Sequence, residues 1–187
     1  MTILKEPKEQ KEPKEPKEPK EPKLKQEIEK YTYTQVELAI VEHFDKEKNL
    51  IIPNCFMDYK AKISHECDIL LINTTGYATE VEIKMSVSDF KADFKKKHKH
   101  DDERLKYLYY AVPHYIKDKC LELVPEYGGL MSISKNKRGK FIIEIIKNAP
   151  KKVCRKFTLE EKYRFARLCS LKYWNAKIKY IKKETKK

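Results

Sequence analysis

Hydrophobic positions fall into runs and periodic patterns that divide the chain into predicted helices and strands. Residues 33–45 place apolar side chains at helical spacing, with Thr34 as the expected N-cap. Residues 67–73 and 77–84 are two apolar runs joined by a Thr-Thr-Gly turn, which predicts a hairpin around Gly76. Apolar and polar side chains alternate along the second run, so one face of this predicted strand carries charge.

Segments on either side of the hairpin complete the predicted element order. A strand interrupted by Pro53 is expected over 50–58, and a helix capped by Ser86 is expected to run to about Lys97. The second half of the chain predicts strands at 107–112, 129–134 and 140–147, with a short helix near 114–122. The order helix, three strands, helix, strand predicts a mixed α/β layer architecture.

A long amphipathic helix is predicted near the end of the chain. Thr158 is its expected N-cap, and Glu161 completes a capping box. Its predicted apolar stripe consists of Tyr163, Ala166, Leu168, Leu171, Trp174 and Ile178.

A repeat of Lys-Glu-Pro occupies residues 5–23, with Gln10 replacing one proline. Proline at every third position prevents helix and sheet, and the repeat offers no apolar surface to bury. We therefore expect residues 1–30 to be an extended, disordered tail. Residues 31–187 have the length of one ordinary domain and are expected to fold as a unit.

Charge is unevenly distributed along the chain, whose net charge is +13. Residues 31–134 contain 14 basic and 17 acidic side chains, whereas residues 135–187 contain 19 basic and four acidic ones. A basic C-terminal third predicts a polyanionic partner, and DNA is the partner we expect. No apolar run is long enough to span a bilayer, and five scattered cysteines without a Cys-x-x-Cys pair favour free thiols in the cytoplasm.

Asp68, Glu82 and Lys84 are the residues whose pattern predicts chemistry. Glu82 and Lys84 are two apart in a strand, so their side chains share a face, and the hairpin brings Asp68 beside them. Two carboxylates and an ammonium on one face of a sheet are costly unless they have a functional role. Cross-strand salt bridges on an exposed strand are the alternative interpretation.

Hydrolysis of a phosphodiester with a bound divalent ion is the function that fits these groups. Mg²⁺ prefers oxygen ligands and keeps several waters, so Asp68, Glu82 and the backbone carbonyl of Ile83 suffice, and Mn²⁺ is an expected substitute. Lys84 is expected to contact the attacking water and the phosphate. The two acids repel each other, so we expect raised carboxylate pKa values without metal.

A longer string around these residues resembles the PD-(D/E)XK nuclease superfamily, and within it the chain is similar to the MmcB-related DNA repair family. The string runs Asp68…Glu80-Val81-Glu82-Ile83-Lys84-Met85-Ser86-Val87-Ser88-Asp89-Phe90-Lys91-Ala92-Asp93. Later segments agree: Tyr109-Tyr110-Ala111-Val112-Pro113, Gly129-Leu130, Asn148-Ala149-Pro150 and Tyr163-Arg164-Phe165-Ala166-Arg167-Leu168. The likeness spans about residues 31–175, and Cys67 stands where many members have proline.

This resemblance implies a restriction-endonuclease-like αβββαβ core with a mixed sheet, followed by a C-terminal helix, and Mg²⁺-dependent cleavage of DNA. It implies that Asp68 and Glu82 are metal ligands and that Lys84 is the catalytic lysine. Many such nucleases also carry a glutamate on the first helix. Glu37 is the best positional match, with Glu42 as the alternative.

Other charged side chains near the motif receive structural interpretations. Glu80 shares the face of Glu82, and a solvated edge position is expected for it, with an extra metal ligand or an acid supporting the ligands as the alternative. Asp93 is expected to pair with Lys96 or Lys97. His100 is expected to lie in a solvated, highly charged loop, with a metal site as the alternative.

The sequence therefore predicts a small metal-dependent DNA endonuclease acting in repair, recombination or DNA processing. The side chains expected to contact DNA are Ser86, Lys137, Arg138, Arg155, Arg164 and Arg167. A second hypothesis is a non-catalytic nucleic-acid-binding module on a nuclease fold, and RNA is an alternative substrate. Nuclease folds of this type often pair to cut two strands, so a homodimer is a further expectation.

Overall fold

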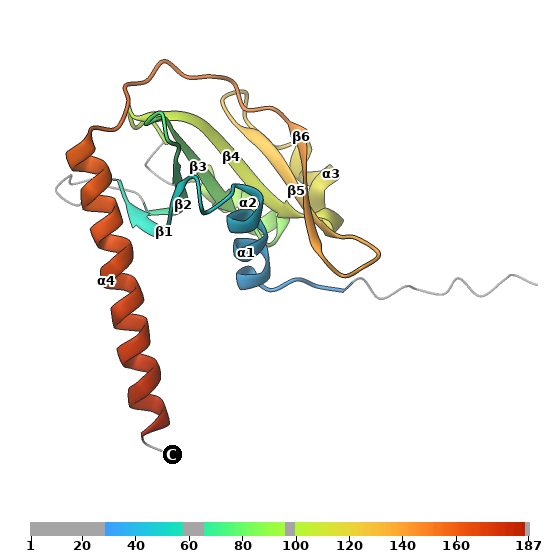
Figure 1. The fold of residues 1–187 in the computed structure, drawn as a ribbon. Helices are drawn as coiled ribbons and strands as arrows, with labels where there is room; N and C mark the ends of the chain where they lie inside the picture. Colours follow the sequence, from blue (N-terminus) through green and yellow to red (C-terminus); the bar gives the residue numbers. More distant parts are fainter. Residues whose placement is uncertain (1–28, 58–65, 96–99, 186–187) are drawn as a thin grey trace, which may run out of the picture.

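A six-stranded sheet with helices against it makes up the described part of the chain, residues 29–57, 66–95 and 100–185 of a computed structural model (Figure 1). The helices are α1 (Tyr33–His43), α2 (Val87–Asp93), α3 (Lys117–Leu121), which follows the 3-10 turn η1 (His114–Ile116), and α4 (Leu159–Glu184). The strands are β1 (Leu50–Phe56), β2 (Glu66–Ile72), β3 (Ala78–Ile83), β4 (Leu105–Pro113), β5 (Gly129–Lys135) and β6 (Phe141–Lys147). The predicted Lys-Glu-Pro tail lies outside the described residues up to position 28.

Strand order in the sheet follows the chain, from β1 at one edge to β6 at the other. β1, β2 and β3 form an antiparallel meander, β3, β4 and β5 run parallel, and β6 returns antiparallel to β5. The parallel step from β3 to β4 requires a crossover, and α2 lies in that connection. The predicted α/β class, with a mixed sheet and a C-terminal helix, is confirmed.

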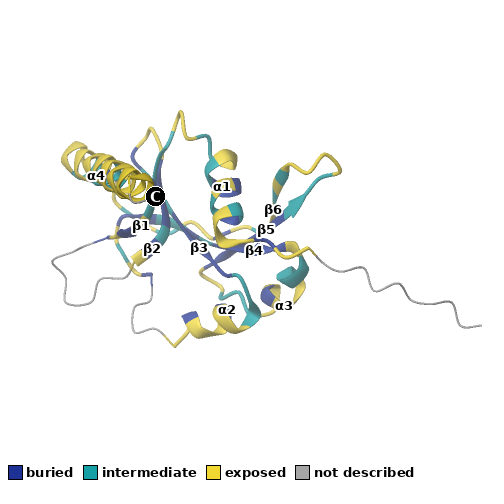
Figure 2. Ribbon diagram, turned by 90° about the horizontal axis from the view of Figure 1, so that it is seen from below, coloured by how far each residue is buried: buried dark blue, intermediate teal, exposed yellow. Residues whose placement is uncertain are grey.

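Hydrophobic side chains fill both faces of the sheet. On one face, Ile40 of α1 packs with Ile69 and Val81 of the central strands. On the other face, Phe90 of α2 packs with Tyr110 of β4. Figure 2 shows α1 on one side of the strands and α2 and α3 on the other. Because side chains alternate along β2 and β3, both strands also contribute to a further apolar cluster, which includes side chains of β1 and α4.

Two helix boundaries differ from the sequence-based prediction. Thr32, and not Thr34, caps α1, because the Thr32 hydroxyl accepts the Gln35 N–H while the Gln35 side chain accepts the Thr32 N–H. α2 ends at Asp93, earlier than predicted, and Lys97 lies outside the described residues. The cap that the sequence predicts for α2 is correct, since the Ser86 hydroxyl accepts the Asp89 N–H.

Strand β1 lies at the edge of the sheet, where α4 covers it. Pro53 lies inside β1 and does not interrupt it, because a missing N–H costs little on an edge strand. Side chains of α4 bond to the carbonyls of this strand. Lys172 Nζ donates to the Pro53 oxygen at 2.7 Å and also to the Asn54 oxygen, and the Cys169 thiol donates to the Ile51 oxygen at 3.8 Å.

Helix α4 begins as predicted and packs differently from the prediction. Thr158 and Glu161 form the expected capping box. The predicted apolar stripe is wrong as a packing face except at Leu168, which is half-buried against the core, since its other five members are exposed and Trp174 is 53% exposed. The buried residue is Phe165, which meets Phe157 edge to face. All residues from 173 to 185 are exposed, and Figure 1 shows this half of α4 extending away from the sheet.

Cysteines and helix lengths bear on two further predictions. All five cysteines lie within the described residues and are free thiols, as predicted. Cys55 and Cys67 are buried and face each other across β1 and β2. None of the helices in the described ranges combines the length and the apolar character that crossing a bilayer requires.

Candidate active site

The hairpin of β2 and β3 brings Asp68 and Glu82 together. Ile69 pairs with Val81 across the two strands, which places Asp68 opposite Glu82. The Ile83 N–H donates to Asp68 Oδ2 at 2.8 Å, and the Asp68 N–H points to Glu82 Oε1 at 3.5 Å. The two predicted acids therefore meet at the open end of the hairpin, near the start of β2 and the end of β3, and Ile83 contacts Asp68 through its backbone N–H.

Lys84 completes the predicted group of three. Its Nζ donates to Glu82 Oε2 and to Asp93 Oδ1, each at 2.8 Å. Lys84 and Glu82 are almost wholly buried, with exposed fractions of 3% and 1%. Asp93 was expected to pair with Lys96 or Lys97, which lie outside the described residues. Because Asp93 lies one turn after the buried Phe90, it faces the sheet and receives Lys84.

Helix α1 contributes two side chains to the same place. Burial raises the pKa of the half-buried Glu37 carboxyl, and the charge of Asp68 raises it further, while Lys172 opposes the shift. Burial also raises the pKa of the Tyr33 phenol, as do the charges of Asp68 and Glu37 and a side-chain hydrogen bond to Asp68. The charge of Glu37, which was predicted from the resemblance alone, thus interacts with the charge of Asp68. Tyr33 was missed, although it lies one turn before Glu37 on the same helix face.

Repulsion among these acids changes their titration. Burial, together with the charges of Asp68 and Glu80, raises the pKa of Glu82 to about 7, although Lys84 lowers it in part. Burial alone would lower the pKa of Lys84, but Glu82 and Asp93 outweigh burial and raise it. The lysine therefore stays charged, and Glu82 takes up a proton near neutral pH when no cation is bound.

A buried polar chain lies behind Lys84. His100 Nδ1 contacts Glu80 Oε1 at 2.9 Å, and His100 Nε2 contacts Asp93 Oδ2 at 3.1 Å. The Tyr110 hydroxyl donates to the same Asp93 oxygen at 3.4 Å. The solvated positions expected for Glu80 and His100 are wrong, since the two residues are 0% and 3% exposed. Because side chains alternate along β3, Glu80 lies on the same face as Glu82, and this alternation could have predicted that Glu80 belongs to the site.

Two sets of ligand atoms could hold a metal ion. Asp68 and Glu82 offer carboxylate oxygens, the donors that Mg²⁺ prefers, and their mutual repulsion would be relieved by a cation. Glu80, Glu82 and His100 form the second set, with ligand atoms within 4.8 Å of one another. Its imidazole suits softer ions such as Zn²⁺, and binding there would require His100 to release Glu80.

Side chains predicted to contact DNA are distributed over several elements. Ser86 caps α2, two residues beyond Lys84. Arg155 forms ion pairs with Glu103 and Glu161, so it clamps the start of α4. The other four are exposed: Lys137 and Arg138 lie in the β5–β6 turn, and Arg164 and Arg167 lie on α4.

Comparisons with known proteins establish the fold alone. No protein-family model matches the chain, and no curated protein matches it. Among solved structures, the chain is similar to a protein of unknown function from Silicibacter pomeroyi, with a TM-score of 0.57 and 17% sequence identity. The likeness covers 80% of this chain and 94% of that chain.

Proposed function

We propose that this chain is a metal-dependent endonuclease that hydrolyses phosphodiester bonds of DNA in repair, recombination or DNA processing. The observation that supports the proposal is the convergence of Asp68, Glu82 and Lys84 at the open end of the β2–β3 hairpin, opposite its turn. Such a set, with a perturbed carboxyl among its members, is more typical of an active site than of a structural salt bridge. The resemblance to PD-(D/E)XK nucleases in the same residues agrees with this reading.

Asp68 and Glu82 would hold the metal ion, which we propose to be Mg²⁺ with Mn²⁺ as a substitute, and the carbonyl of Ile83 would add a third oxygen. The donor set fits, because the pKa of Glu82 is raised to about 7 by burial and by neighbouring acids, and a cation removes that penalty. A divalent ion bound there polarises a phosphate and lowers the pKa of a bound water.

Lys84 would stabilise negative charge that develops on the phosphate and help to position the attacking water. Its neighbours Glu82 and Asp93 keep the ammonium charged and fix its position. Tyr33 hydrogen-bonds to Asp68 and would orient that carboxylate, and Glu37, whose charge interacts with that of Asp68, would help to orient the water next to it. Because the Lys84 ammonium is already charged and in position, it needs no rearrangement during the reaction.

A DNA substrate is supported by the charge of the C-terminal third of the chain. Residues 135–187 carry 19 basic and four acidic side chains, and the exposed ones can bind phosphates. Contacts to phosphates do not read sequence. We therefore favour cutting directed by DNA structure or damage over cutting at a fixed sequence.

A non-catalytic nucleic-acid-binding module is the second candidate. Its supporting observation is burial, because Glu82 and Lys84 are 1% and 3% exposed and already satisfy each other. Buried ion pairs of this kind also occur as structural features. In that case the acid–acid–lysine group would hold β3 to α2, and DNA would bind to the basic surface alone.

A cleavage assay tests the two candidates. Supercoiled plasmid, single-stranded DNA and RNA are each incubated with the protein in Mg²⁺, Mn²⁺ or EDTA. We expect metal-dependent DNA cutting that falls by about a hundredfold or more in Lys84→Ala. Lys119→Ala, an exposed change on α3, serves as the control. DNA binding without cutting by either protein would favour the second candidate, and cutting of RNA alone would reassign the substrate.

A further inference from the structure

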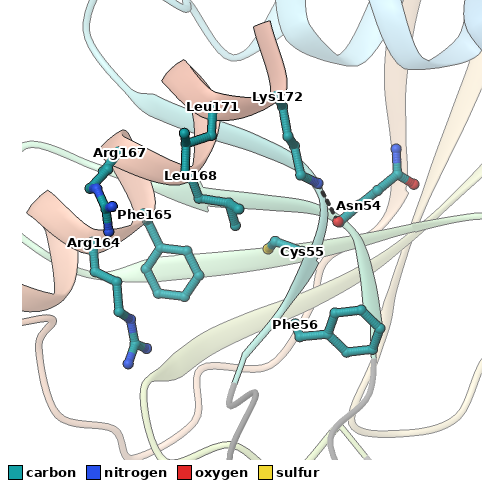
Figure 3. A pocket seen from close by; sticks show the side chains of 9 residues that line it. All are labelled: Asn54, Cys55, Phe56, Arg164, Phe165, Arg167, Leu168, Leu171 and Lys172. Carbon is teal, nitrogen blue, oxygen red and sulfur yellow. Dashed lines mark hydrogen bonds between the residues drawn. The ribbon is translucent and has the colours of Figure 1, made fainter. Parts of the chain in front are cut away.

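A groove of about 440 Å³ lies between β1 and α4 (Figure 3). Its floor is apolar, because Phe165, Leu168 and Leu171 of α4 meet Cys55 and Phe56 of β1. Phe56 and Leu171 remain 49% and 47% exposed. Aromatic and aliphatic surface is thus open to a ligand at this edge of the sheet.

Basic side chains form the rim of the groove. Arg164 and Arg167 lie one turn apart on α4, and both are exposed. In Figure 3 both guanidinium groups lie on the side of Phe165 away from Lys172. None of the described residues that line the groove is acidic. Along the sequence, α4 has eight basic and no acidic side chains from 162 to 183.

One end of the groove adjoins the candidate active site. Lys172 bonds to the carbonyls of Pro53 and Asn54, so its ammonium helps to fix α4 against β1. The charge of Lys172 lowers the pKa of Glu37, whose carboxyl in turn interacts with Asp68. Pro53 also pairs with Ile69 of β2, the neighbour of Asp68, so the Lys172 end of the groove lies one strand away from the acids.

We propose that this groove binds an unpaired segment of a DNA strand, with bases on the apolar floor and phosphates on Arg164 and Arg167. Unpaired bases stack on aromatic and apolar side chains, whereas phosphates require cations, and the groove supplies both next to each other. A blunt duplex keeps its bases stacked inside, so it can reach the rim and not the floor. The inference rests on the proposed function, and it specifies DNA with unpaired nucleotides beside the cut as the substrate.

Binding to the full chain in EDTA tests the groove without any cleavage. Fluorescence anisotropy compares a labelled single strand with the blunt duplex of the same sequence. We expect the single strand to bind about tenfold more tightly. The double variant Arg164→Gln/Arg167→Gln is expected to weaken single-strand binding by about tenfold. Phe56→Ser should remove most of the preference for the single strand and leave duplex binding unchanged.

Matched controls make the outcome decisive. Lys119→Gln removes an exposed positive charge on α3 and should change single-strand binding by less than about twofold. Equal losses in Lys119→Gln and in the arginine double variant would overturn the inference. So would equal affinity of the wild type for strand and duplex, or binding to anionic phospholipid vesicles that competes with the oligonucleotide.

Failure of the groove and failure of the proposed function give different results. If the protein binds single strands through Arg164 and Arg167 and cuts no DNA, the groove stands and the nuclease proposal falls. If it cuts DNA and the groove variants bind and cut like the wild type, the nuclease proposal stands and the groove inference is overturned. Circular dichroism confirms that each variant is folded.

Discussion

Lys84 and Asp93 are joined by an ion pair of 2.8 Å that is almost wholly buried. Asp93 comes from α2, and its second oxygen receives His100. The pair ties the proposed catalytic lysine to the helix behind the sheet. The position and charge of Lys84 therefore depend on a carboxylate outside the acid–acid–lysine motif.

Replacement of Asp93 by asparagine should reduce the chemical step. The neutral amide keeps the shape of the side chain but removes the charge that raises the pKa of Lys84. We expect kcat for DNA cleavage to fall by about tenfold to a hundredfold with little change in KM, since the loss concerns the transition state. Asp118→Asn, an exposed change on α3, is the control. A folded Asp93→Asn protein with normal kcat would refute this positioning role.

Stability should fall as the pH rises through the titration of His100. Burial lowers the pKa of this imidazole, but hydrogen bonds to Asp93 and Glu80 outweigh burial and raise it to about 9. The folded pKa lies above the ordinary value of 6.5, so the stabilisation is complete below pH 6.5 and is lost as the pH approaches 9. The loss should be about 3 kcal/mol.

Urea unfolding at the two ends of this pH window measures the effect. The stability difference between the wild type and His100→Gln should shrink between pH 6.5 and pH 9. Groups that do not interact with His100 titrate alike in both proteins, so the comparison isolates His100 together with the acids that it contacts. If stability changes with pH in the same way in the wild type and in His100→Gln, then His100 is not positively charged in the folded protein.

Mg²⁺ should bind more tightly as Glu82 loses its proton. Burial and neighbouring acids raise the pKa of Glu82 to about 7, so ionisation above its ordinary pKa of 4.5 costs stability unless a cation is present. We expect Mg²⁺ to raise the melting temperature more at pH 8 than at pH 6. Glu82→Gln should abolish the shift, whereas Glu122→Gln, after α3, should retain it. A shift that is the same at both pH values would exclude Glu82 as a ligand.

Phe165 should anchor α4 to the rest of the protein. It is 2% exposed and packs against Phe157, whereas Tyr163 on the same helix is 70% exposed. Phe165→Ala is expected to lower the free energy of unfolding by about 3 to 5 kcal/mol, or to release α4. Tyr163→Ala should change it by about 0.5 kcal/mol or less. Chemical denaturation followed by circular dichroism gives both values, and similar losses in the two variants would contradict this role for Phe165.

The hairpin that carries Asp68 and Glu82 could be predicted from sequence because its signals are local. One continuous apolar run and one alternating run, separated by a turn with Gly76 at φ +89°, indicate both the strands and the register between them. The register alone then brings the two acids together. The capping box of Thr158 follows from equally local chemistry.

Residues that meet through distant elements could not be found in this way. Asp93 meets Lys84, and His100 meets Asp93, although both lie in a highly charged stretch of the sequence, which favours a solvated interpretation. The opposite error concerns α4, whose apolar side chains were predicted to pack and are mostly exposed. A hydrophobic stripe such as that of Trp174 normally predicts packing, but this half of the helix extends past the sheet.

Hydrogen bonds from α4 to the carbonyls of Ile51, Pro53 and Asn54 occupy positions that a strand of another molecule would need. An uncovered edge strand is a template for intermolecular pairing. The C-terminal helix thus covers carbonyls through which a strand of a neighbouring molecule could extend the sheet. A protein shortened before Lys172 would be expected to aggregate even if its remaining core stayed folded.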